Sequence, residues 1–205
     1  MARPRRDERG PSAKERLQLA FWDLLEKSPS ASITVKELSA KAGVNHNTFY
    51  YHYGSMTELA RDAVLSSVSD GLTGTLLTVL VQSPLEPEKL PDDTQLAEPY
   101  RRMRLLARNG SFELLRAACD VIVGRWLERF GIGSEELTDD DRMRISFAWG
   151  GIVTLIGSDQ ADTIAVYRAA IEGGIGNAVS GLLRQILSEH GVLPQPSRDG
   201  RGRVV

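Results

Sequence analysis

Residues 33–59 read ITVKELSAKAGVNHNTFYYHYGSMTEL, and this segment contains the strongest indications of the fold. Thr34, followed three residues later by a glutamate, forms a capping box, which begins a helix. Gly43 suits the left-handed conformation in which helices commonly end. Asn45 can cap a second short helix, in which Phe49 is the expected buried anchor. Two short helices joined by a tight glycine turn form a helix-turn-helix.

The second helix of this motif has a polar and aromatic outer face. A helix can read the major groove of DNA only if its outer side carries compact hydrogen-bonding groups. Asparagine can bond adenine at two points, and hydroxyl groups can bond phosphates without carrying charge. The alternative is a hairpin whose polar face is only solvated, but exposed aromatic side chains on so short a helix are unfavourable unless something covers them. The predicted DNA-contacting residues of this helix are Asn45, His46, Asn47, Thr48, Tyr50, Tyr51 and His52.

Positive charge is concentrated at the N-terminus. The chain has a formal net charge of −2, yet basic side chains outnumber acidic ones over residues 1–61 and most of the excess lies in the first sixteen residues. Such an arm can follow a polyanion such as DNA, through Arg5 and Arg6 among others. The alternative is a solvated leader that only aids solubility.

The segments before and after the motif also carry capping and periodicity patterns typical of helices. Ser12 and Ser55 begin two further capping boxes, and the helix after Ser55 is expected to reach Val81. Residues 82–99 are rich in proline and acidic residues and are expected to form an exposed loop with at most one turn of helix. Further helices are predicted over residues 100–108, 112–130, 138–158 and 162–190. No convincing pair of strands is visible, so the expected fold is all-α with about nine helices.

The motif resembles that of the tetracycline-repressor (TetR) family of one-component transcriptional regulators. The matching positions are Thr34, Leu38, Ala42, Gly43, Val44, Thr48, Phe49, Tyr50, His52, Tyr53 and Leu59. The resemblance covers about residues 12–65 by motif and the rest by helix order. It implies a three-helix DNA-binding domain that a fourth helix joins to a helical ligand-binding and dimerising domain. The expected divisions are a basic flexible arm at 1–11, a helix-turn-helix domain at 12–57, an effector-binding and dimerisation domain at 58–193 and a flexible tail at 194–205.

The resemblance also assigns roles to individual residues. Phosphate contacts fall to Thr34, Thr48, Tyr50 and His52. Base edges, or the backbone beside them, fall to Asn45, His46, Asn47 and Tyr51. Lys36 completes the predicted DNA-binding set.

Three positions depart from the family pattern. Asn45 replaces the usual serine cap and Tyr53 replaces the usual phenylalanine, and both exchanges are mild. Met56 stands where the family commonly has a lysine, so one charged phosphate contact is missing. The basic arm can compensate for that loss.

Glycines in the last two predicted helices indicate a close helix-helix contact. An interior glycine costs a helix about 1 kcal/mol relative to alanine, which suggests a compensating close approach of another backbone. Gly150, Gly151 and Gly157 repeat the pattern of Gly173, Gly174, Gly176 and Gly181. We expect two helices per subunit to form a four-helix dimer interface, as the resemblance also implies. The predicted interface residues are Ile152, Leu155, Ile171, Ile175, Val179, Leu182 and Ile186.

A mainly apolar set of side chains in the C-terminal part is predicted to line an effector pocket. The resemblance implies such a pocket, although most aromatic and methionine residues at helical spacing pack in the core. The candidates are Met103, Leu106, Phe112, Leu115, Cys119, Ile122, Trp126 and Trp149. Because few polar groups lie nearby, the expected effector is mainly apolar.

Several classes of function have no supporting motif. The sequence contains no Gly-x-Ser-x-Gly motif of serine hydrolases, no His-Glu-x-x-His motif of zinc proteases and no phosphate-binding loop that ends in Gly-Lys-Ser/Thr. No catalytic residue is therefore predicted. A single cysteine and three histidines offer no metal site, and no cofactor is predicted. A membrane span and a secretory signal are also missing, so a cytoplasmic location is expected. The prediction is a homodimeric, ligand-responsive repressor of a palindromic operator. The alternatives are a helical enzyme with an appended DNA-binding domain and an architectural protein without an effector.

Overall fold

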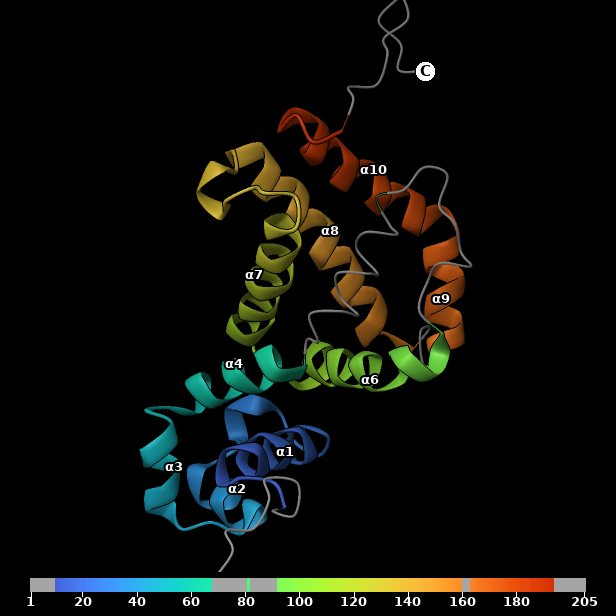
Figure 1. Cartoon of the computed structure of the whole chain (residues 1–205). Coiled ribbons are helices and arrows are strands. Elements are labelled where there is room, and N and C mark those ends of the chain that lie inside the picture. Colours follow the sequence, from blue (N-terminus) through green and yellow to red (C-terminus); the bar gives the residue numbers. More distant parts are fainter. Residues whose placement is uncertain (1–9, 68–80, 82–91, 160–162, 194–205) are drawn as a thin grey trace, which may run out of the picture. The chain divides into compact units, whose positions relative to one another are not determined.

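The computed structural model describes residues 10–67, 81, 92–159 and 163–193 of the chain. All regular elements in these segments are helical: nine α-helices and two short 3₁₀ turns (Figure 1). The prediction of an all-α fold is therefore confirmed. Two compact units can be distinguished by their internal contacts. The N-terminal unit falls within residues 1–68 and 101–118, and the C-terminal unit within residues 69–100 and 119–205.

The N-terminal unit is built around its first helix. Its four leading helices are α1 (Ala13–Leu25), α2 (Val35–Ala42), α3 (His46–His52) and α4 (Met56–Ser67). Helix α1 packs against each of the other three. The largest fully buried side chains here are Leu17, Phe21, Leu25, Leu38, Phe49 and Leu59. The helices of the predicted motif, α2 and α3, therefore share one core with α1 and α4.

Local cap chemistry sets where these helices begin and end. The capping boxes begun by Ser12 and Thr34 are formed, with both reciprocal hydrogen bonds in each. Ser55 also caps as predicted, accepting from the backbone N–H of Glu58 at 3.1 Å. Gly43 ends α2 with φ of 61°, in the left-handed region that glycine occupies without a steric penalty. The predicted sharp turn between α2 and α3 is confirmed.

The loop predicted over residues 82–99 is wrong at its C-terminal end. Residues 82–91 lie outside the described segments, but α6 (Asp93–Asn109) already begins at Asp93. Asp92 and Gln95 cap this helix reciprocally: Gln95 N–H donates to Asp92 Oδ1 at 2.9 Å, and Asp92 N–H donates to Gln95 Oε1 at 3.2 Å. Pro99 lies inside the helix and removes one backbone hydrogen-bond donor. The prediction that the helix after Ser55 reaches Val81 falls on residues 68–80, outside the described segments.

The C-terminal part of the chain contains α7 (Phe112–Glu128), α8 (Asp139–Gly157), α9 (Ile164–Glu172) and α10 (Gly174–Glu189). The single long helix predicted over residues 162–190 is wrong, because Gly173 is extended (φ −97°, ψ −154°) and separates α9 from α10. At Gly176 a Cβ atom would collide with the backbone carbonyl of Ile171. This glycine therefore permits the tight connection within one chain, which differs from the interhelical role predicted for it.

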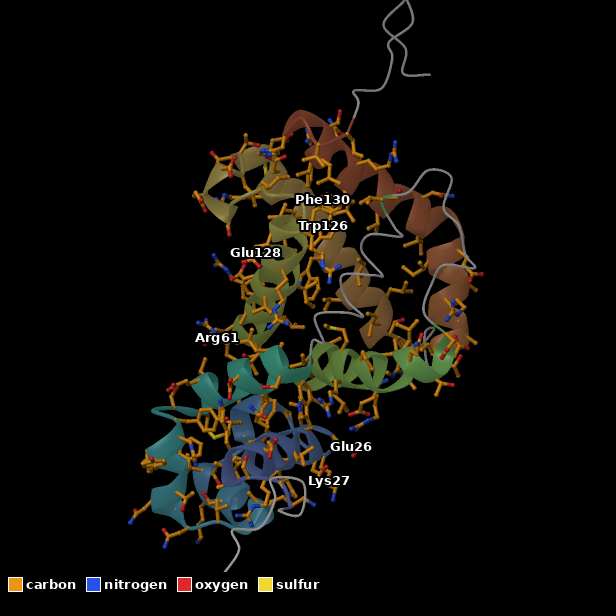
Figure 2. The ribbon with its side chains drawn as sticks, in the orientation of Figure 1. Glu26, Lys27, Arg61, Trp126, Glu128 and Phe130 are labelled. Carbon is orange, nitrogen blue, oxygen red and sulfur yellow. The ribbon has the colours of Figure 1, made fainter. Side chains whose placement is uncertain are left out.

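Within the C-terminal unit, α10 packs against α8 and α9. One buried cluster contains Trp126, Leu127, Ile132, Val179, Leu183 and Leu187, and a second contains Cys119, Ile145 and Ile186. The rings of Trp126 and Phe130 meet edge to face with centroids 5.5 Å apart (Figure 2). None of the helices in the described segments has the length and apolar composition required to cross a bilayer.

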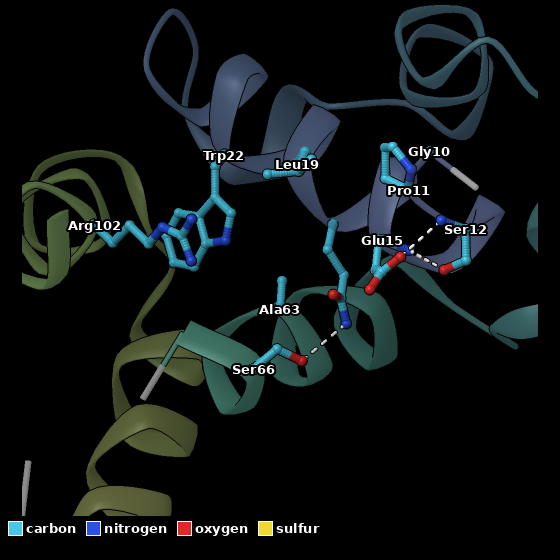
Figure 3. A pocket seen from close by; sticks show the side chains of 10 residues that line it. Gly10, Pro11, Ser12, Glu15, Leu19, Trp22, Ala63, Ser66 and Arg102 are labelled. Carbon is cyan, nitrogen blue, oxygen red and sulfur yellow. Dashed lines mark hydrogen bonds between the residues drawn. The ribbon is translucent and has the colours of Figure 1, made fainter. Parts of the chain in front are cut away.

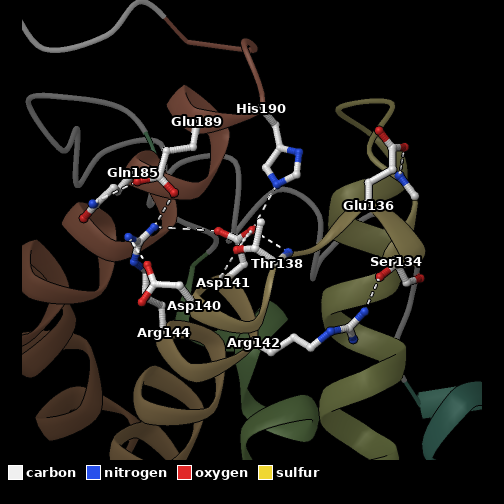
Figure 4. A network of polar contacts seen from close by, with 11 residues as sticks. Ser134, Glu136, Thr138, Asp140, Asp141, Arg142, Arg144, Gln185, Glu189 and His190 are labelled. Carbon is white, nitrogen blue, oxygen red and sulfur yellow. Dashed lines mark hydrogen bonds and ion pairs between the residues drawn. The ribbon is translucent and has the colours of Figure 1, made fainter.

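A polar network joins the start of α8 to the end of α10 (Figure 4). Asp141 is fully buried and accepts from the hydroxyl and backbone N–H of Thr138 at 2.7 and 2.9 Å. His190 Nε2 lies 3.1 Å from the same carboxylate oxygen. Arg144 forms ion pairs with Asp140 and, at 2.6 Å, with Glu189. Burial alone would raise the pKa of Asp141, but the bonds from Thr138 and the contact with His190 lower it.

Replacing Asp141 by asparagine should flatten the acid dependence of stability. A carboxyl whose pKa is lower in the folded state contributes stability that is complete above its unfolded pKa and is lost as the pH falls through its folded pKa. At pH 7 the variant should lose about 1–3 kcal/mol of unfolding free energy, and the deficit should shrink below about pH 4. Urea unfolding measured from pH 7 to pH 3 tests this. Asp140→Asn is the control, since Asp140 is exposed, and equal deficits for both variants would contradict the assignment.

Candidate nucleic-acid interface

Helix α3 has one buried side and one exposed side. Phe49 has no exposed surface and fixes the helix to the core of the N-terminal unit. On the other side, 56% of Tyr50 and 84% of Tyr51 are exposed. Asn45, His46 and Asn47 are also exposed, while Thr48 and His52 are half-buried. All seven residues predicted from this helix therefore lie on or beside one accessible surface.

The side chains of this surface hold one another in place. The ring of His46 meets Tyr50 edge to face at 5.1 Å, and the ring of Tyr51 meets His52 at 5.0 Å. Asn45 uses its amide oxygen to cap the helix, accepting from the Asn47 N–H at 2.9 Å. Ordered side chains reduce the conformational entropy that a bound partner would have to remove.

The predicted contacts outside α3 differ in their surroundings. The Thr34 hydroxyl donates to Glu37 at 2.7 Å, so a donation from Thr34 to a phosphate would break this bond. Lys36 is exposed in the first turn of α2. Arg5 and Arg6 lie outside the described segments.

Residues 22–63, which include all of α2 and α3, match the family described as "Bacterial regulatory proteins, tetR family". Over these residues the chain is similar to regulators of the TetR family. Over 65 residues it is 35% identical to the "Uncharacterized HTH-type transcriptional regulator YxbF" of Bacillus subtilis (strain 168). That match covers 31% of this chain and only 17% of the relative.

The chain is also similar to one solved structure. The crystal structure of the TetR family repressor AlkX from Dietzia sp. strain DQ12-45-1b, implicated in biodegradation of n-alkanes, is similar with a TM-score of 0.45 and 16% sequence identity. The alignment covers 86% of this chain and 97% of that chain.

The predicted effector residues divide between the two units. Met103, Leu106, Phe112 and Leu115 belong to the N-terminal unit, and Cys119, Ile122, Trp126 and Trp149 to the C-terminal unit. Leu106 is fully buried, whereas Phe112 is 81% exposed. Cys119 is buried, and this burial raises the pKa of its thiol to about 12. Ile122 and Trp149 are half-buried.

Trp126 is the predicted effector residue with an unusual feature. Its ring is buried, and its indole N–H has no hydrogen-bond acceptor among the described residues. A buried donor without an acceptor costs about 1–3 kcal/mol, so native structures rarely retain one without a reason. A polar atom of a bound molecule would remove this cost.

The predicted dimer residues also fall into two groups. Ile171, Val179 and Ile186 are buried within a single chain, with Ile186 in the cluster around Cys119, so they have little surface to offer a partner. Ile175 is 46% exposed, and Ile152, Leu155 and Leu182 are half-buried. The periodicity of apolar residues had not separated these groups, because core-facing and partner-facing residues share the same spacing.

The largest exposed apolar side chains of α8 were not predicted. Met143 is 63% and Phe147 78% exposed. Phe147 borders a shallow hollow of about 560 Å³ along α8, whose other lining residues are Ser146, Gly150, Gly151, Thr154, Leu155 and Ser158. A Cβ atom at Gly150 or Gly151 would meet only open space. The spacing of Met143, Phe147 and the two glycines was the sequence signal for this face.

A larger hollow, of about 860 Å³, lies in the N-terminal unit along α1 and α4 (Figure 3). The guanidinium of Arg102 stands 5.3 Å from the ring centre of Trp22 at its rim. Glu15 bonds Ser12, and the Gln18 amide donates to the Ser66 hydroxyl at 3.0 Å. Because these polar groups already form hydrogen bonds with each other, they give no indication of a bound ligand.

Proposed function

We propose that the protein is a homodimeric transcriptional repressor that binds a palindromic operator and is released from it by a small, mainly apolar effector. Its place of action would be the cytoplasm. The observation that carries this proposal is the exposed face of α3, on which polar and aromatic groups surround the single buried anchor Phe49. Such a face is unfavourable in water and suits a major groove.

In this proposal the side chains of α3 make two kinds of contact with DNA. Thr48, Tyr50 and His52 bond phosphates, which position the helix but carry no sequence information directly. His46 and Asn47 reach base edges, which determine the preferred sequence. Tyr51, the most exposed of the aromatic residues, lies against the backbone or a base edge beside them.

Dimerisation follows from the small size of the recognition helix. Seven residues contact few base pairs, and a second copy doubles the site that is read. The exposed face of α8 around Phe147 is the proposed contact surface, and the occupant is α8 of a second copy. Gly150 and Gly151 allow the two backbones to approach closely, because neither position is filled by its own chain.

The proposed effector site lies in the C-terminal unit, around Trp126, Cys119, Ile122 and Trp149. These mainly apolar side chains favour an apolar ligand. The N–H of Trp126, which has no acceptor among the described residues, favours a ligand with one hydrogen-bond acceptor such as a carbonyl, ether or hydroxyl oxygen. Release from DNA requires that the effector binds the conformation with low operator affinity more tightly than the DNA-bound one.

Selection of DNA from a random pool tests the proposal. The purified protein should enrich an inverted repeat whose half-sites are centred about 10 base pairs, or a multiple of this, apart. A His46→Ala, Asn47→Ala double variant, which removes both proposed base contacts and keeps the Asn45 cap, should enrich no consensus under the same salt conditions. Binding without any consensus in the wild type would favour an architectural protein, and failure to bind DNA would contradict the proposal.

A further inference from the structure

The C-terminal end of α3 is tied to the rest of the N-terminal unit through one carboxylate oxygen. The hydroxyl of Tyr53, the residue that ends α3, donates to Oδ2 of Asp62 at 2.7 Å. The Gln18 side-chain amide donates to the same oxygen at 2.7 Å, and the Lys14 ammonium lies 2.9 Å from it. Asp62 therefore joins three elements: α1, its own helix α4 and the end of α3.

The position of a helix as short as α3 depends on such contacts with neighbouring helices. Seven residues form few backbone hydrogen bonds, so tertiary contacts decide where the helix lies. Phe49 is one anchor, and Tyr53 is the other: only 3% of it is exposed, and its backbone N–H donates to the Phe49 carbonyl at 2.8 Å. A displacement of Tyr53 would therefore be passed directly to the end of α3.

The charge states favour this hydrogen bond. Burial alone would raise the pKa of Asp62, but the hydrogen bonds from Tyr53, Lys14 and Gln18 lower it, so the carboxylate is charged at neutral pH. Burial and the neighbouring carboxylate both raise the pKa of Tyr53, so its hydroxyl keeps the proton that it donates. The Gln18 amide also donates to the Ser66 hydroxyl at 3.0 Å, which holds this side chain in place.

The pairing also accounts for two features of the sequence. Lys14 belongs to the basic N-terminal stretch, and its ammonium, although the side chain is 49% exposed, is paired with Asp62 at 2.9 Å. Tyr53 replaces the phenylalanine usual in the family pattern, an exchange that the sequence suggested was mild. In the structure the added hydroxyl has a specific charged partner.

We propose that Asp62 is a positioning residue for DNA recognition, which acts through the Tyr53 hydroxyl to fix the recognition helix against α1 and α4. The proposal rests on the proposed function, in which α3 reads base edges. With the bond intact, the base-contacting side chains reach the groove in one register. Without it, α3 still binds the phosphate backbone but loses discrimination between sequences.

Tyr53→Phe is the direct test, because it removes only the hydroxyl. Affinity for the selected operator should fall about tenfold, the effect of one hydrogen bond to a charged group. Affinity for a shuffled duplex of the same length and at the same salt concentration should stay within about twofold, since phosphate contacts dominate it. General damage to the fold would weaken both affinities, so their ratio is the informative quantity.

Variants at Asp62 separate the hydrogen bond from the charge. Asp62→Asn keeps an acceptor for Tyr53 but loses the ion pair with Lys14, and it should retain most of the discrimination. Asp62→Ala should behave as Tyr53→Phe does, and combining the two should add little, because both remove the same interaction. Asp23→Ala is the control, since it breaks the exposed ion pair with Lys41 at 3.1 Å in the same unit and leaves Tyr53 untouched.

The outcomes distinguish the two proposals. A wild-type protein that does not discriminate the selected operator from the shuffled duplex contradicts the proposed function. A wild type that discriminates, together with a Tyr53→Phe variant that discriminates equally well, overturns the role of Asp62 alone. Tyr53→Phe keeps the buried ring, so it carries the test even if Asp62→Ala fails to fold.

Discussion

Replacing Phe147 by arginine should turn the proposed dimer into a monomer and weaken operator binding by roughly a hundredfold or more, because two linked half-site contacts become one. Phe147 is 78% exposed in the single chain, so the substitution leaves the core of the C-terminal unit unchanged. In a dimer formed through α8, the same side chain is covered by the partner. An arginine there would bury a charge without a counter-ion, which is strongly unfavourable.

Light scattering at micromolar concentration measures the dimer, and titration of the selected operator at fixed salt measures its affinity. Val166→Arg is the matched control, since Val166 is 43% exposed on α9 and does not line the hollow along α8. It should remain dimeric. A Phe147→Arg protein that is still dimeric would show that this face of α8 is not the contact surface.

The N-terminal helices could be predicted closely because their signals are local. Ser12, Thr34 and Asn45 each bond a backbone N–H two or three residues away, so the sequence spacing alone specifies the cap. The exposed face of α3 followed in the same way, since one buried phenylalanine among polar residues determines which side faces outward. The start of α6 was missed because Asp92 and Gln95 lie beside prolines that suggest a loop.

The C-terminal unit was predicted less well because its signals depend on distant residues. Apolar spacing on α10 placed Ile186 at the dimer interface, although it packs against residues from α7 and α8 within one chain. The break at Gly173 was hidden among several glycines that are otherwise compatible with a helix. In the N-terminal unit, the hydrogen bond between Gln18 and Asp62 was also not predicted, because the two residues lie 44 positions apart in the sequence.

Asn47→Ala and Tyr50→Phe should weaken operator binding in different ways. Asn47 is exposed, and its cap contact uses the backbone N–H, so alanine removes only the side-chain amide that is proposed to contact a base. The loss should be about 1–3 kcal/mol on the preferred site and small on a site already mismatched at that base pair. Tyr50→Phe keeps the ring against His46 and removes one proposed phosphate contact, so all sites should weaken by a similar factor.

The claim that α3 reads sequence through its exposed face can be tested by a binding measurement on a panel of operators. Each duplex carries one substituted base pair of the selected site, and each is titrated with wild type, Asn47→Ala and Tyr50→Phe at one salt concentration. Asn47→Ala should lose its preference at a single base pair in each half-site and keep it elsewhere, while Tyr50→Phe should keep the whole profile at lower affinity. If Asn47→Ala keeps the complete wild-type profile, Asn47 does not read a base and the claim is contradicted.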